Sequence, residues 1–402
     1  MSRVSITVSD ADALLRGLVR PVPEESVPLW EAAGRILREP VKADAAYPPF
    51  DRVCMDGFAL RADAGNRSEF HVDGFVPAGH SPIPLIRPEG CIEVMTGAAL
   101  PQGTDCIVPV EDIIRTGDII KLKSGTFLKT GQHIHSAGKD YRAGDILLEP
   151  GLRLNGPHLA VAAAVGQTQL RVSKRPAFHL LLTGDELVPV GKKPGGVQIR
   201  MTHPYALQGL IKPWADLTFE QVRDDAGEIG RAIQSALKKC DVLLLTGGVS
   251  AGRHDWVPEA LGSLGAKTLF HKVKQRPGNP LWVGESAEGK PIFAFPGNPV
   301  AACVCARRYL LPWMWRCLGM DEPVPLNLPL AEAQKGLEDK VLFSPVTRRN
   351  AADGSWEAHA SRIQGSGDFG GLAASHGFVE ITAGRNRVEA GEKVPYFDWS
   401  FA

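Results

Sequence analysis

Residues 241–256 read DVLLLTGGVSAGRHDW, and this stretch decides the fold. Its first part, DVLLLTGG at 241–248, is apolar along both faces of an expected strand, which is typical of a strand buried inside a parallel sheet. A glycine-rich turn follows, and a helix is expected near 255–264. A strand that passes through such a turn directly into a helix predicts an α/β domain.

The flanking sequence repeats this order from Pro176 onward. The expected strands lie at AFHLLLT (177–183), DLTFEQV (216–222), 266–273 and PIFAF (291–295), and the expected helices lie at 203–214, at 224–239 and from Val300. This alternation predicts a parallel, doubly wound sheet, and ligands of such sheets bind beyond the carboxyl ends of the strands.

The rest of the chain is less regular. Helices are expected at 9–20, 25–38 and 158–166, β-rich lobes over 47–172, a linker after Met320 and a turn-rich β segment to the C-terminus. The predicted fold class is therefore a multidomain α/β protein with β-rich N-terminal lobes. Its expected domains are domain I (1–46 and 135–175), inserted domain II (47–134), α/β domain III (176–324) and domain IV (325–402), a small barrel or sandwich.

The composition excludes several classes of protein. Lys+Arg and Asp+Glu each number 45, so the formal net charge is zero and a general nucleic-acid-binding surface is not expected. The sequence contains no apolar run long enough for a membrane span, and its N-terminus lacks the pattern of a signal peptide. Seven cysteines without a C-x-x-C pair indicate reduced thiols. We therefore expect a cytoplasmic protein without nucleic-acid or membrane partners.

Three turns that follow expected strands are candidates for holding an anion. They contain Thr183-Gly184-Asp185, Thr246-Gly247-Gly248 and Pro296-Gly297-Asn298-Pro299. Glycine lets backbone amides approach a phosphate, and the start of a helix favours negative charge. Ser250 and Gly252 belong to the same TGGVSAG turn and complete the predicted binding set. For TGGVSAG alone, a plain tight turn between strand and helix is the alternative.

Acidic residues lie beside these turns and in the lobes. Glu186 and Asp255 follow the expected strand ends, whereas Asp56 lies in an MDG sequence and Asp140 in AGKDYRAGD. Carboxylates that face a bound anion repel it unless a cation lies between them. Glu186 and Asp255 are therefore the predicted metal ligands. The alternative is that each acid is an ordinary solvated loop residue.

Basic residues occur beside a further proline–glycine turn. Lys272 and Arg276 lie in HKVKQR (271–276), where they would neutralise an oxyanion. The alternation of this segment fits an ordinary strand with one solvated face equally well. The sequence has no H-x-x-x-H pair, no serine nucleophile elbow and no Walker A loop, which argues against zinc hydrolases, serine hydrolases and P-loop NTPases.

Five segments together resemble the molybdenum-insertion family, which includes the bacterial MoeA proteins and the E domain of gephyrin. They are FDRVCMDGFAL (50–60), TGAALPQGTDCIVPVED (96–112), LTGDELV (182–188), TGGVSAGRHDW (246–256) and FPGNPVAA (295–302). The resemblance covers nearly the whole chain. It implies a MogA-like α/β domain, a C-terminal β-barrel domain and the insertion of molybdate into adenylylated molybdopterin with release of AMP, with Mg²⁺ as the expected cation.

The resemblance also implies roles for individual residues. By motif, the implied catalytic residues are Asp56, Thr96, Asp140, Glu186, Asp255, Lys272 and Arg276, and the implied substrate-binding residues include Gly248, Ser250, Pro296, Pro299 and Ser366. The family works as an elongated homodimer whose site combines both subunits. Other enzymes of molybdenum-cofactor biosynthesis, and the enzymes that receive the cofactor, are the expected partners.

The chain departs from the family pattern at several positions. Met201-Thr202-His203 replaces the usual Asp-Ser/Thr-Asn triplet, and Val53 replaces the serine before MDG. Asn279 replaces a basic residue of the K-P-G-K-P motif, and Pro345 replaces the arginine of F-x-R-G. These changes leave three interpretations open: an insertase with reduced activity, a non-catalytic paralogue that stores or hands over molybdopterin, and a scaffold whose site is vestigial.

Overall fold

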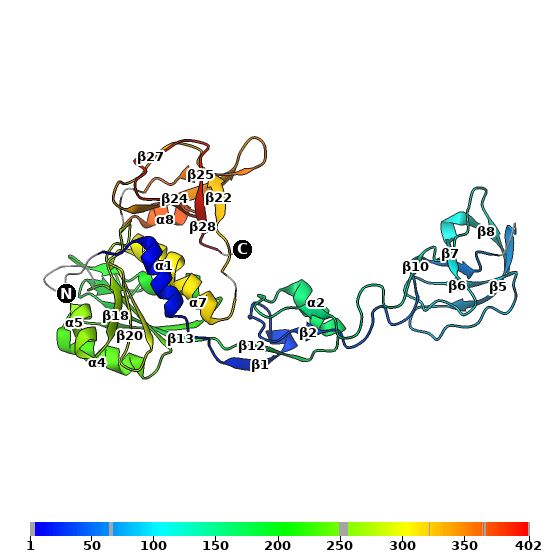
Figure 1. The fold of residues 1–402 in the computed structure, drawn as a ribbon, viewed down its shortest axis with the longest axis horizontal. Coiled ribbons are helices and arrows are strands. Elements are labelled where there is room, and N and C mark those ends of the chain that lie inside the picture. Colours follow the sequence, from blue (N-terminus) through cyan, green and yellow to red (C-terminus); the bar gives the residue numbers. More distant parts are fainter. Residues whose placement is uncertain are drawn as a thin grey trace.

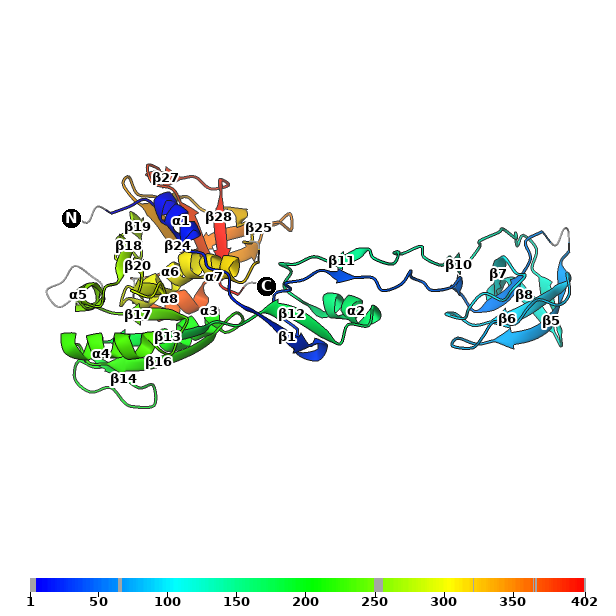
Figure 2. The same cartoon turned by 60° about the horizontal axis from the view of Figure 1, so that its bottom comes forward.

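The computed structural model describes residues 5–63, 67–248, 256–320, 322–363, 365 and 367–400. An α/β body and the C-terminal β domain lie side by side, and two β-rich lobes extend from the body in a row (Figure 1). The turned view in Figure 2 shows the same order of parts. The outer lobe is therefore far from the α/β body of its own chain.

A six-stranded mixed sheet in the order β16-β13-β17-β21-β20-β18 forms the α/β body. Its strands are β13 (Ala177–Thr183), β16 (Asp216–Val222), β17 (Val242–Thr246), β18 (Lys267–His271), β20 (Trp282–Glu285) and β21 (Pro291–Phe295). The first four strands of that order are parallel, as predicted. The expectation of an all-parallel sheet is wrong at the other edge, because β20 runs antiparallel to both β21 and β18. Only residues 286–290 join β20 to β21, too few for a parallel crossover.

Helices cover both faces of this sheet, so the doubly wound prediction is confirmed. On one face, Ile229 and Ile233 of α4 (Ala226–Leu237) and Val257 of α5 (Trp256–Ser263) pack with the sheet. The other face carries α1 (Val8–Gly17), α3 (His203–Ile211) and one helical run made of α6 (Pro299–Cys305), the π-helical turn η3 (Ala306–Leu310) and α7 (Leu311–Cys317).

Two expectations for the N-terminal region differ from the structure. The predicted helix at 9–20 is α1, and its Ala11 and Leu15 pack in the core of the α/β body rather than in the lobe expected for residues 1–46. The predicted helix at 25–38 is wrong. Residues Glu24–Pro28 form β1, which pairs with β12 (Gln169–Ser173). Pro28 has no N–H to donate inside a helix, so it favours this break.

The two lobes are small β structures. The inner lobe contains β1, β12, η1 (Leu29–Glu31), β2 (Val41–Lys42), β11 (Ile146–Leu148) and α2 (Gly156–Ala164), the last as predicted. A pair of strands, β3 (Arg52–Val53) and β10 (Ile134–His135), leads to the outer lobe. The outer lobe is a six-stranded sheet of β4 (Gly57–Leu60), β5 (Glu69–Val76), β6 (Gly90–Val94), β7 (Cys106–Pro109), β8 (Ile113–Thr116) and β9 (Ile119–Leu122), with η2 at Val110–Asp112.

The C-terminal domain is a small closed β structure. Its strands are β22 (Leu326–Pro329), β24 (Val341–Asn350), β25 (Trp356–Ala360), β26 (Gly377–Ile381) and β28 (Lys393–Asp398), with α8 at Phe369–Ala374. The Ala331 N–H donates to the Ala358 carbonyl and closes β22 onto β25, which gives the predicted barrel. Short pairs are formed by β23 (Gln334–Lys335) with β27 (Arg387–Val388), and by β19 (Gln275–Arg276) with β24.

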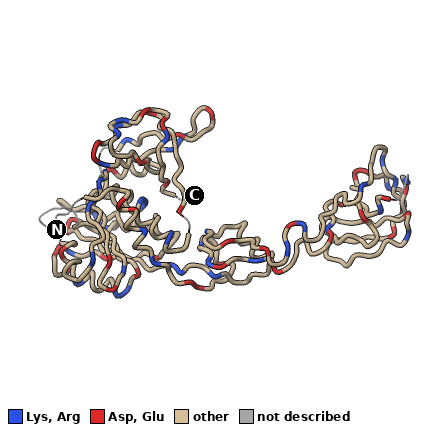
Figure 3. Tube along the Cα trace, viewed as in Figure 1, with Lys and Arg blue, Asp and Glu red and all other residues tan. Residues whose placement is uncertain are grey.

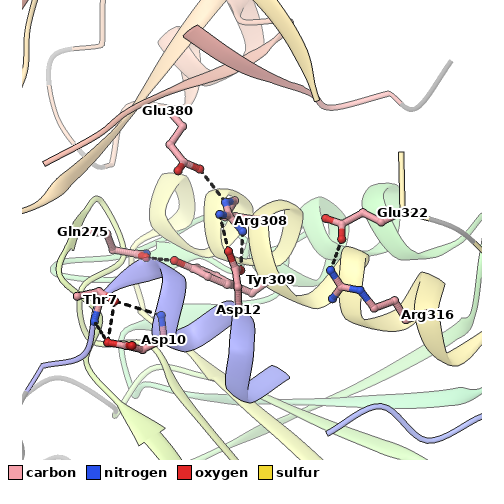
Figure 4. Close-up of polar contacts among 9 residues, drawn as sticks. All are labelled: Thr7, Asp10, Asp12, Gln275, Arg308, Tyr309, Arg316, Glu322 and Glu380. Atoms are coloured by element: carbon pink, nitrogen blue, oxygen red, sulfur yellow. Dashed lines mark hydrogen bonds and ion pairs between the residues drawn. The ribbon is translucent and has the colours of Figure 1, made fainter. Parts of the chain in front are cut away.

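A mostly buried arginine joins three parts of the chain. Arg308 donates two hydrogen bonds of 2.8 and 2.9 Å to Asp12 of α1 and one of 2.9 Å to Glu380 of β26 (Figure 4). The π-helical turn also carries Arg307, whose Nε donates to the Asp398 carbonyl at 2.6 Å. The C-terminal domain is therefore held to the body by charge-assisted hydrogen bonds as well as by apolar packing.

We predict that Arg308→Met lowers the free energy of unfolding by about 3 kcal/mol, because it leaves two partly buried carboxylates without their partner. The side chains of Asp12 and Glu380 are only 24% and 14% exposed. Urea unfolding measures the change. The matched control is Arg223→Met, which removes the ion pair between Glu228 and a 78% exposed arginine side chain and should change little. Equal effects of the two changes would contradict the role given to Arg308.

Candidate functional site

The carboxyl ends of β13, β17 and β21 bring three turns into contact. A Cβ added at Gly247 would lie 2.6 Å from the Thr183 carbonyl oxygen and 2.7 Å from its hydroxyl. A Cβ added at Gly297 would lie 3.5 Å from the Gly247 Cα. The structure thus brings together Thr183, Gly247 and Gly297 from the three turns that the sequence singled out.

The glycines of the TGG turn are required by backbone geometry. Gly247 has φ +89° and Gly248 has φ +62°, values that residues with side chains rarely adopt. A Cβ at Gly248 would also approach Val257 at 3.1 Å. Any larger residue here would displace the turn. The backbone is therefore the surface that this turn can offer to a ligand.

The third turn begins the long helical run of the body. Asn298 caps α6 by accepting a hydrogen bond from the Ala301 N–H at 3.5 Å, and Pro299 occupies the first helical position. Pro296 is buried, whereas Gly297 is exposed. The run continues through η3 and α7, so its positive dipole end lies at this turn and favours an anion.

The two acids after β13 have different surroundings. Asp185 accepts a hydrogen bond from the Asp224 N–H at 3.2 Å, which fixes the loop before α4. The exposed Glu186 folds back over the buried Gly184, where an added Cβ would lie 2.7 Å from its carboxylate. Gln221, which belongs to none of the sequence motifs, donates to the carbonyls of Gly184 and Leu187 at 3.3 and 2.9 Å. Its position at the end of the neighbouring strand was the available signal.

Four predicted residues lie outside the described part of the chain. They are Ser250, Gly252, Asp255 and Ser366. Their roles therefore stay predictions. After Glu186, β14 (Leu187–Val188) and β15 (Ile199–Arg200) pair at the base of an exposed loop that carries Lys192 and Lys193.

The predicted basic pair lies where the body meets the C-terminal domain. Lys272 has φ +72°, its N–H donates to the Leu281 carbonyl, and its own carbonyl accepts from the Ile6 N–H. Arg276 is exposed in β19, which pairs with β24. The same segment contacts Cys305 through Gly278, further along the helical run than Pro299. An added Cβ at Gly278 would also lie 3.7 Å from the Ala301 carbonyl oxygen in the first turn of α6, so the segment packs along this helix.

The predicted acids of the N-terminal lobes are not in the body. One Asp56 carboxylate oxygen accepts hydrogen bonds from the N–H and the hydroxyl of Thr96, both at 2.7 Å, and these bonds lower the pKa of Asp56. Asp56 immediately precedes β4, so the Asp56–Thr96 pair lies in the outer lobe. Asp140 contacts His135 at 2.7 Å, near the strand pair that leads to that lobe.

The positions that depart from the family pattern are mostly buried. Met201 is 4% exposed and lies in the main core of the body, and His203 is 6% exposed at the start of α3. Val53 is fully buried in the outer lobe. The Asn279 amide donates to the Val273 carbonyl at 2.6 Å, and Pro345 lies in β24 opposite Phe378. Each departure therefore fits a local packing or backbone role.

The described residues do not form a preassembled metal cage. Within the described ranges, no group of three or more His, Cys, Asp or Glu side chains is placed to hold a metal ion. Mg²⁺ is commonly bound through one or two carboxylates together with substrate phosphates and water. Glu186 fits such a shared site, and Asp255 lies outside the described residues.

The charged residues are not segregated by sign along the described chain. Lys, Arg, Asp and Glu are interleaved along all parts of the chain (Figure 3). Among the described residues, none of the helices combines the length and apolar character that a bilayer crossing needs. An anionic ligand must therefore be held by local geometry.

Comparison with known families identifies all parts of the chain. Residues 6–166 match the MoeA N-terminal region (domain I and II), residues 180–315 match a probable molybdopterin binding domain, and residues 327–399 match the MoeA C-terminal region (domain IV). The first range contains α1 and most of the lobes, the second most of the α/β body, and the third the barrel.

Individual proteins show the same similarity. A molybdopterin molybdenumtransferase of Synechocystis is 34% identical over 371 residues, which cover 91% of this chain and 93% of that protein. One from Nostoc is 30% identical and covers 92% and 87%. The crystal structure of a molybdopterin biosynthesis MoeA protein from Pyrococcus horikoshii OT3 superposes with a TM-score of 0.83 at 26% identity, covering 98% of this chain and 100% of that one.

Burial lowers the pKa of His203 from its ordinary 6.5 to about 4. The unfolded chain binds this proton near pH 6.5, so the stability contributed by neutral His203 is complete above that pH and is lost as the pH falls toward 4. The full loss is roughly 3 kcal/mol. We predict that His203→Gln flattens the plot of unfolding free energy against pH between 6.5 and 4.5. The exposed His80→Gln should leave the slope unchanged, and the same slope in the His203 variant would contradict the assignment.

Proposed function

This chain belongs to the MoeA family, whose curated relatives are named molybdopterin molybdenumtransferase, and on this premise we propose that it inserts molybdate into adenylylated molybdopterin and releases AMP. The supporting observation is the contact among Thr183, Gly247 and Gly297 at the carboxyl edge of the sheet. The alternative of a non-catalytic paralogue has no specific observation in its favour.

The strand-end turns suit a pyrophosphate. Two glycines with positive φ leave the TGG backbone open to close approach, and the N-terminus of the helical run favours negative charge. A ligand phosphate held there needs no net positive protein surface. We expect these turns to fix the pyrophosphate, so that the dithiolene end of the pterin is positioned for reaction.

The exposed Glu186 is the described carboxylate best placed beside this anion. A divalent cation, when bound, supplies the positive charge that lets a carboxylate and a phosphate lie together. Glu186 would hold that cation from the protein side, and Asp255 is the second predicted ligand. The Thr183 hydroxyl, which donates to the Thr246 carbonyl at 3.5 Å, keeps the two strand ends in register beneath the ligand.

We further propose that the enzyme is a homodimer with a shared cleft. The outer lobe, with Asp56 and Thr96, lies at one end of the molecule, and the strand-end turns lie in the body at the other (Figures 1 and 2). Residues so far apart in one chain can act together when a partner subunit supplies the lobe. Sedimentation that showed only monomer at micromolar concentration would contradict this.

The departures from the family pattern concern the insertion step. The loops expected to bind phosphate are intact, so pterin binding should be retained. Met201 lies in an apolar core and cannot supply the carboxylate that the family has there. We therefore expect molybdate insertion to be slower than in relatives that keep the acid.

The cysteines bear on where the protein works in the cell. All seven cysteines are free, and six of them are buried. We expect a cytoplasmic enzyme that receives its substrate from an adenylylating enzyme and passes its product to molybdenum enzymes.

The direct test is incubation with adenylylated molybdopterin, molybdate and Mg²⁺, followed by measurement of AMP. We expect AMP release that depends on molybdate. Bound pterin without AMP release would instead support the storage alternative, and the absence of both would support the scaffold.

We predict that Gly248→Val weakens pterin binding at least tenfold, about 1.4 kcal/mol, because a side chain at φ +62° and 3.1 Å from Val257 would displace the turn whose backbone is proposed to hold the phosphate. Isothermal titration measures the affinity, and thermal melting verifies the fold. The matched control is Gly262→Val, at a helical glycine with open space around it, which should bind normally. Equal affinities in the two folded variants would show that the turn does not contact the ligand.

A further inference from the structure

A cavity lies at the amino ends of the central strands, whereas the strand-end turns lie at their carboxyl ends. Its volume is about 190 Å³. Phe178, Val242 and Pro291, which line it, stand at the beginning of β13, β17 and β21, whereas the candidate active site lies at the ends of these strands. The cavity is therefore separate from the site described above.

The cavity lies at the hinge between the body and the lobes. Residues 20–23 carry the chain out to the inner lobe, residues 174–176 bring it back, and both segments line the cavity. The Lys174 N–H donates to the Pro23 carbonyl at 2.8 Å, and the Val22 N–H donates to the Cys317 carbonyl at 2.9 Å. A ligand here would touch both linkers and the end of α7.

The walls combine apolar surface with an excess of positive charge. Trp313 and Met314 are buried and contribute apolar surface with Phe178. The charged residues that line the cavity are Arg20, Lys174, Arg175 and Asp241. Arg20 is paired with Glu285 at 3.3 Å, and the Asp241 carboxylate accepts from the Ala177 N–H at 2.8 Å. Lys174 and Arg175 therefore remain as the cations that a ligand would meet.

Arg175 lies between this cavity and a smaller pocket that Pro213 and Trp214 line. Its Nη2 donates to the Lys212 carbonyl at 2.7 Å, which fixes the guanidinium. Its Nε is buried and has no hydrogen-bond partner among the described residues. A buried donor without an acceptor is costly, and a fixed guanidinium matches the planar shape of a carboxylate.

We propose that this hinge cavity binds a small carboxylate with a compact apolar body. A cavity of about 150 Å³ lined by apolar side chains is large enough for benzene, so this one accommodates a molecule of the size of benzoate. The carboxylate meets Arg175 and Lys174, and the apolar body meets Phe178, Trp313 and Met314. The proposal does not depend on the function proposed above.

The test is titration of the full-length protein with benzoate, with the neutral benzamide as the matched probe. We expect one benzoate per chain and at least tenfold weaker binding of benzamide. Arg175→Gln should weaken benzoate at least tenfold, and Val22→Phe should block it by filling the cavity. Arg171→Gln, which changes an exposed arginine of β12 outside the cavity, should bind as the unchanged protein does.

Hydrogen exchange on the unchanged protein locates the ligand without a variant. Benzoate should slow the exchange of the backbone amides at Val22 and Lys174, which hydrogen-bond across the hinge. No binding of benzoate at millimolar concentration would overturn the proposal. Binding that Arg175→Gln and Val22→Phe both leave unchanged, in variants that melt normally, or protection elsewhere only, would overturn it as well.

Discussion

The close approach of Gly247 to Thr183 is the constraint on which the candidate site depends. With only 2.6 Å between a would-be Cβ and the Thr183 carbonyl, the turn after β17 can lie against β13 only as glycine. Because β13, β17 and β21 are parallel, the three turns lie together at the carboxyl ends of these strands, and the glycines let the turns contact one another. The site is thus a property of backbone packing, with few charged side chains, in a chain of zero net charge.

Two sets of contacts connect the α/β body, which carries these turns, to the barrel and to the lobes. Arg308 ties α1 and the barrel to the long helical run whose first turn carries Asn298 and Pro299. At the amino ends of the same strands, the paired linkers at 20–23 and 174–176 connect the body to the lobes. The carboxyl ends of β13, β17 and β21 therefore lie at the candidate reaction site, and their amino ends lie at the hinge cavity between the body and the lobes. Movement at that hinge would place the outer lobe, and Asp56 with it, differently in space.

The sequence predicted local patterns well and non-local choices poorly. Strands such as AFHLLLT and the turns after them were found because burial and glycine leave a local signal. The antiparallel strand β20 was missed, since its direction depends on a five-residue connection to β21 and not on its own residues. The helix expected at 25–38 was wrong because pairing of β1 with a segment about 145 positions away overrides local propensity. Burial of Met201, and the bridging amide of Gln221, depend on tertiary contacts that no motif records.

The central claim is that one subunit's strand-end turns and the partner subunit's outer lobe form one site, and complementation tests it most directly. Asp56→Ala and Glu186→Gln should each abolish molybdate-dependent AMP release as homodimers. When the two variants are co-expressed, half of the dimers are mixed and each mixed dimer has one intact site, so about a quarter of the unchanged activity should return. A mixture that stays inactive although mixed dimers form, or full activity in an isolated monomer, would contradict the claim.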